Sequence, residues 1–191
     1  DAADVVLFDD RFRYQTAFYQ LTLLATLAGI TRGAVTEFAL QAKKRSRVYS
    51  HGSSAQWNQD PLVQRTVGVA EAQAFAALAT AVRAAEAPQD AYLARFSGVD
   101  EEDANIRAEL DSARGQVVVI DLALSATGSL FNALGASAIS ETKRLDRFWR
   151  NARTVSSHNP VIFKQRIVGD WAINQTPPPF VWAIGTQRPT S

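Results

Sequence analysis

The sequence contains no cysteine, which excludes disulfide bonds, thiolate metal ligands and cysteine nucleophiles. Histidine is almost as scarce, since His51 and His158 are the two histidines in the sequence. They stand far apart, so neither has a second histidine at a metal-binding spacing. Neither a Gly-rich phosphate loop nor the Glu-x-x-His pair of di-iron helical bundles occurs. These absences predict that the chain binds no metal and carries no active site complete in itself.

An excess of charge of one sign is also lacking, since 20 Lys and Arg residues and 19 Asp and Glu residues leave a net charge of +1. This balance gives no field that attracts nucleic acid. The apolar stretch at 18–30 is interrupted by Gln20, Thr22 and Thr26 and is too short to cross a membrane. The start of the chain is acidic, unlike a signal peptide. We therefore expect a cytoplasmic protein with no nucleic-acid or membrane partner.

Methionine is absent as well, and the chain begins Asp1-Ala2-Ala3-Asp4. We therefore expect it to be part of a longer polypeptide. The 191 residues present are 47% hydrophobic, which is enough to bury the core of one domain of ordinary size.

Apolar residues at helical spacing predict long helices at 14–47, 60–86, 101–133 and 137–152, and a short one at 161–170. Asp60-Pro61 is a strong helix start, and Pro88 is expected to stop or kink the second helix. The dense alanines of 70–87 predict close helix packing. A strand at 117–120 is the alternative for the third helix, but its apolar pattern continues on both sides.

Polar residues 50–56 predict a loop, and 156–160 a turn. Three consecutive prolines at 177–179 indicate that the tail, 176–191, is extended. The sequence therefore predicts an all-α fold, an antiparallel four-helix bundle over 13–175 with a short extra helix and an extended tail.

The C-terminal third carries a specific pattern, Leu145-Asp146-Arg147-Phe148-Trp149-Arg150-Asn151-Ala152-Arg153-Thr154 followed by Ser157-His158-Asn159-Pro160. This pattern resembles the C-terminal domain of the dibenzothiophene monooxygenase group, flavin-dependent monooxygenases related to acyl-CoA dehydrogenases. The segments 130–137 and 59–68 are similar to that group too. The resemblance extends over nearly the whole chain, but only these blocks are specific.

The resemblance implies a homotetrameric enzyme in which an N-terminal helical domain and a β-domain precede this bundle. Residues 1–12 are then the linker leaving the β-domain. A separate flavin reductase supplies reduced FMN, with FAD as the alternative. Oxygen adds to the flavin to form a C4a-hydroperoxide, which oxygenates an aromatic or heterocyclic small molecule.

The resemblance also assigns candidate site residues. His158 matches the loop histidine beside the flavin ring, where imidazole can donate a proton or hydrogen bond; its alternative role is to cap the fourth helix. Asn159 orients His158 or contacts the cofactor. Arg147 and Arg150 suit a flavin phosphate, or else form salt bridges within the bundle. Gly135 and Ser137 permit close approach of the backbone to the cofactor.

An aromatic group in the loop between the first two helices, Tyr49, His51 and Trp57, is a candidate wall of the substrate pocket, although a loop histidine such as His51 is often a bystander.

One rival function is that of an acyl-CoA dehydrogenase, whose paired glycines are replaced here by Gly135-Ala136-Ser137. The other rival is a non-catalytic helical oligomerisation module.

Overall fold

The computed structural model describes residues 13–98 and 100–181, so the predicted linker at 1–12 and the tail beyond 181 lie outside the described residues. Every regular element in the described ranges is helical. The elements are α1 (Gln15–Lys44), η2 (Trp57–Gln59), α2 (Pro61–Ser97), α3 (Glu101–Ser129), α4 (Phe131–Leu134), η3 (Ala136–Ala138), α5 (Asp146–Ser156) and α6 (Val161–Asn174).

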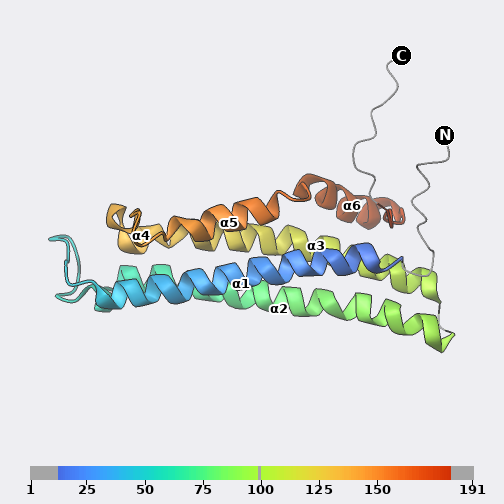
Figure 1. Cartoon of the computed structure of the whole chain (residues 1–191), viewed down its shortest axis with the longest axis horizontal. Helices are drawn as coiled ribbons and strands as arrows, with labels where there is room; N and C mark the ends of the chain where they lie inside the picture. The colour runs from blue at the N-terminus through green and yellow to red at the C-terminus, as the bar shows by residue number, and fades with distance from the viewer. Residues whose placement is uncertain (1–12, 99, 182–191) are drawn as a thin grey trace, which may run out of the picture.

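The long helices α1, α2 and α3 lie side by side with alternating direction, and α5 and α6 follow one another along them as the fourth member of the bundle (Figure 1). The predicted all-α antiparallel bundle is therefore confirmed. The alternative strand at 117–120 is part of α3.

The start of α2 forms as the sequence predicts. The Asp60 carboxylate accepts hydrogen bonds from the backbone N–H groups of Ser53 and Leu62, each at 2.8 Å. These bonds hold the pKa of Asp60 below its usual value, chiefly through the Ser53 bond. Pro61 occupies the first helical position, where a backbone N–H would have no acceptor within the helix, so the proline costs the helix no hydrogen bond. Asp60 thus joins the preceding loop to the helix.

The expected helix end before Pro88 is wrong, because α2 continues to Ser97 with Pro88 buried inside it. A proline inside a helix loses one backbone hydrogen bond. The helix continues because its small residues pack closely on both sides of the proline. This buried stripe consists of Ala70, Ala74, Ala77, Ala81, Ala84, Ala87, Ala91 and Ala94. The predicted role of the alanines in close packing is confirmed.

The predicted fourth helix, 137–152, is also wrong at its start. Gly135 has φ +66° and ψ −167°, a conformation that is essentially restricted to glycine. Arg144 has φ +51°, which interrupts the helix a second time. The chain therefore makes only the single turns α4 and η3 here, and α5 begins at Asp146.

The predicted short helix is longer than expected, since α6 extends to Asn174. The described part of the tail, 176–181, has no helix and returns to the bundle. The Thr16 hydroxyl donates to the Phe180 carbonyl at 2.7 Å, and Phe180 packs near Ile106 and Ile167. The tail thereby covers the junction of α1, α3 and α6.

Two stretches, Gln15–Lys44 and Glu101–Leu134, are long and apolar enough to cross a membrane by length and composition alone. One face of each contributes to the bundle core, where Leu24, Phe38 and Leu110 are fully buried. The core helix of a soluble protein passes the same test, so these helices are weak evidence for a membrane span.

Candidate functional site

The predicted catalytic histidine lies in the tight turn between α5 and α6. The backbone N–H of His158 donates to the Val155 carbonyl at 3.2 Å and closes the end of α5, while Pro160 precedes the first residue of α6. The His158 side chain itself is exposed. This geometry presents an imidazole on the bundle surface from a short, well-bonded turn.

Asn159 ties this turn to the bundle interior. Its amide donates to Oε1 of Gln20 on α1 at 2.9 Å, and the same oxygen accepts the amide of Gln116 on α3, also at 2.9 Å. Gln20 and Gln116 are both buried. A single acceptor therefore joins α1, α3 and the His158 turn.

A buried carboxylate lies on the same face of α3. Glu109 and Lys164 of α6 are each only 3% exposed. Burial raises the pKa of Glu109 to about 7, against the opposing effects of the Lys164 charge and a hydrogen bond from the Ala17 backbone N–H. Burial likewise lowers the pKa of Lys164. Glu109 thus holds the first turn of α1 and the first turn of α6 against α3.

A second group of residues lies at the far end of α1, where Arg45 organises the loop. Its guanidinium donates to the Leu134 carbonyl and to the Ser137 hydroxyl, and it stacks on the Trp57 ring at 4.3 Å. The Trp57 indole N–H donates to the Ala133 carbonyl at 2.9 Å. These contacts fix the loop 45–56 against α4 and η3.

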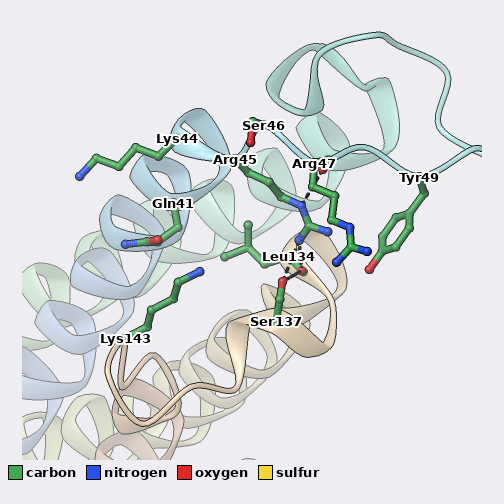
Figure 2. Close-up of a pocket in the computed structure, with 9 residues that line it drawn as sticks. All are labelled: Gln41, Lys44, Arg45, Ser46, Arg47, Tyr49, Leu134, Ser137 and Lys143. Atoms are coloured by element: carbon green, nitrogen blue, oxygen red, sulfur yellow. Dashed lines mark hydrogen bonds between the residues drawn. The ribbon is translucent and has the colours of Figure 1, made fainter.

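A basic pocket of about 310 Å³ opens beside Arg45. Figure 2 shows Lys143 extending from the segment between η3 and α5 toward α1, with Arg47 and Tyr49 on the loop side. None of the nine lining residues is a carboxylate, and four are basic: Lys44, Arg45, Arg47 and Lys143. Such a lining attracts an anion, and guanidinium and ammonium groups are the usual protein ligands of phosphate.

The arginines of α5 have partners within their own segment. Arg150 pairs with Asp146 at 3.0 Å, and Arg147 donates to the carbonyls of Lys143 and Arg144 at 3.2 and 2.8 Å. The pair of Arg150 is exposed and therefore weak. Both arginines lie on the helix that leads away from the basic pocket.

The structure groups the predicted residues in two places. Tyr49, Trp57, Gly135 and Ser137 gather around Arg45, and a side chain at Gly135 would stand 3.1 Å from the Tyr49 hydroxyl. His158 and Asn159 lie at the opposite end of α5, which spans about 16 Å at the usual rise per residue.

The remaining predicted residue, His51, is exposed in the loop next to Tyr49, where its ring lies 3.3 Å from the Ser50 hydroxyl.

Sequence reasoning missed the residues that connect these groups to the bundle. The basic pocket combines the end of α1 with Lys143, which no local motif marks. In the sequence, Gln20 interrupts an apolar stretch, and that interruption is the available signal. A polar residue on the buried face of a helix requires a partner.

Comparisons with known proteins agree on the family. Residues 21–162 match the family described as "Acyl-CoA dehydrogenase, C-terminal domain". The dibenzothiophene monooxygenase of Mycolicibacterium goodii is 29% identical over 83% of this chain and 38% of its own length. The probable FMNH2-dependent monooxygenase SfnC of Pseudomonas putida is 29% identical over 83% of this chain and 40% of its own length.

Among solved structures, FMN-bound TdsC from Paenibacillus sp. A11-2, a dibenzothiophene monooxygenase, superposes with a TM-score of 0.78. It is 30% identical, and the match covers 87% of this chain and 41% of that one. The chain thus spans about two fifths of the length of the relatives it matches. The family match extends over most of the chain, and the chain belongs to the acyl-CoA dehydrogenase C-terminal domain family.

Proposed function

We propose that this chain is the C-terminal bundle of a two-component monooxygenase that uses reduced flavin to oxygenate an aromatic or heterocyclic small molecule. The observation that carries the proposal is the exposed His158 in a turn fixed to the bundle interior, in a chain whose relatives are named as monooxygenases. An acyl-CoA dehydrogenase requires a carboxylate base at the flavin. In this proposal the imidazole of His158 takes the place of that carboxylate.

The residues present fit a flavin phosphate. The basic pocket provides Lys44, Arg47 and Lys143 around a hollow without carboxylates. Ser137 adds a hydroxyl, and the Gly135 backbone allows close approach. Arg147 donates to the carbonyl of Lys143, which lines the pocket, and the weak Asp146 pair leaves Arg150 able to turn toward an anion. We propose FMN as the cofactor, with FAD as the alternative.

His158 then acts at the ring of a flavin whose phosphate lies in the basic pocket of a neighbouring copy, because within one chain the pocket and His158 lie at opposite ends of α5. The bound reduced flavin supplies the activated oxygen for the reaction. The imidazole of His158 would donate a hydrogen bond or a proton to the bound group. Asn159 sets the orientation of the turn, and the turn limits the directions in which the imidazole can point.

The separation of the two groups supports a homo-oligomer, which we propose to be a tetramer. Tyr49, His51 and Trp57, the proposed aromatic wall of the substrate pocket, lie too far from His158 to face the same ligand within one chain. A neighbouring copy closes that gap. The exposed apolar side chains of α2 offer a surface for it: Leu62, Val69, Phe75, Leu78, Val82, Leu93 and Phe96.

The rest of the assembly follows from the length of the relatives. We propose that the complete gene product adds an N-terminal helical domain and a β-domain, joined to the bundle at 13–175 through the linker 1–12. A separate cytoplasmic flavin reductase delivers the reduced flavin. Neither nucleic acid nor a membrane is part of the proposal.

The test is stopped-flow mixing of the complete gene product, loaded with reduced FMN, with oxygenated buffer. The wild type is expected to show a flavin absorbance transient between the reduced and oxidised forms. His158→Ala is expected to shorten its lifetime by at least about tenfold, because general acid–base groups contribute that much or more. Gln165→Ala, an exposed residue of α6, is the matched control and keeps the lifetime. Equal lifetimes in all three proteins would contradict the role of His158.

A further inference from the structure

The turn that carries His158 has a side-chain anchor in the bundle interior. Asn159 donates a hydrogen bond to Gln20 of α1, while Val155 and Val161 on either side of the turn pack against the core. The backbone bonds of the turn return to α5 or pass into α6. The bond to Gln20 thus constrains the residue next to His158.

Gln20 is itself immobilised from the other side. Its Oε1 accepts the Gln116 amide as well as the Asn159 amide, and its side chain is 7% exposed. Gln116 is 3% exposed and belongs to α3. Two donors from different elements converge on one buried oxygen, so this oxygen has little freedom to move without leaving a donor unpaired.

We propose that Gln20 is a positioning residue for His158. Its side-chain oxygen, held by Gln116, fixes Asn159 and through it the turn that presents the imidazole. Gln20 does not touch the reacting atoms. The effect of Gln20 on the reaction rests on the proposed function of His158. The effect of Gln20 on the turn rests only on the hydrogen bonds among Gln20, Gln116 and Asn159.

The hydrogen-bonded contact of Gln20 with Gln116 and Asn159, which we call the clamp, is tested first by hydrogen exchange in the complete gene product. Gln20→Met keeps the length of the side chain and removes the acceptor, and we expect amide exchange at 157–160 to accelerate by about tenfold. Gln20→Glu retains an acceptor at the same reach and is expected to restore most of the protection. The matched control is Gln73→Met, because Gln73 bonds Ser125 between α2 and α3 and makes no contact with the turn. Unchanged exchange in Gln20→Met would overturn the clamp.

The positioning role is tested by a double-mutant cycle on the lifetime of the flavin transient. Gln20→Met is expected to shorten the lifetime about as much as His158→Ala does, and to add nothing when His158 is already alanine. A merely structural loss would shorten the lifetime further in the His158→Ala background, and that result would overturn the positioning role. If His158→Ala alone leaves the lifetime unchanged, the proposed function fails and the positioning role fails with it. The exchange experiment still decides the clamp.

Discussion

Glu109 gives the sharpest stability prediction, because burial raises the pKa of this acid well above its value in the unfolded chain. Its pKa rises from 4.5 to about 7 on folding. Between these two pH values the folded protein keeps a proton on Glu109 that the unfolded chain releases. The contribution of Glu109 to stability is therefore fully present below pH 4.5 and is lost as pH rises through 7. At about 1.4 kcal/mol for each tenfold change in proton affinity, the loss is on the order of 3 kcal/mol.

Glu109→Gln removes this titration and keeps the size of the protonated side chain. About 2 kcal/mol of this loss falls between pH 5 and pH 7, so the thermal midpoint of the variant relative to the wild type is expected to rise over that interval by about 4–8 °C for a unit of this size. Thermal unfolding of the complete gene product, followed by circular dichroism, measures it. Glu71→Gln, on the exposed surface of α2, is the control and should show no such trend. A difference that is flat or falls with pH would refute the account of Glu109.

Three further changes test the far end of the bundle. Trp57→Phe leaves the buried Ala133 carbonyl unpaired and should lower the free energy of unfolding by about 1–3 kcal/mol in urea titrations. Gly135→Ala forces a side chain into a conformation reserved for glycine and against the Tyr49 hydroxyl, and should cost a similar amount, about 1–3 kcal/mol. Lys143→Ala should weaken FMN binding by about tenfold in fluorescence titrations and leave riboflavin, which has no phosphate, unaffected.

The helices were predictable where a local physical rule decides them. Asp60 and Pro61 start α2 as expected, because the capping geometry is contained in adjacent residues. Pro88 misled the prediction, since the burial of the alanines on both sides of it depends on the packing of α2 against α3, which local sequence does not contain. The break at Gly135 and Arg144 was missed for the related reason that a positive φ is not forced by either residue alone.

The sequence supplied candidate site residues, and the structure supplied their arrangement. The pattern around His158 resembles a known family and so identified the turn. Its support by Gln20 and Gln116 comes from helices far away in sequence. In the same way, the basic pocket forms only when Lys143 is brought to the end of α1.

The most direct test of the central claim compares two reactions of the complete gene product carrying FMN. In the first, acyl-CoA is added without oxygen and the flavin absorbance is followed. In the second, the reduced flavin protein is mixed with oxygen. The account predicts that acyl-CoA leaves the oxidised flavin spectrum unchanged, and that oxygen produces a transient whose lifetime depends on His158. Bleaching of the flavin by acyl-CoA, with no transient in oxygen, would contradict the account and establish a dehydrogenase.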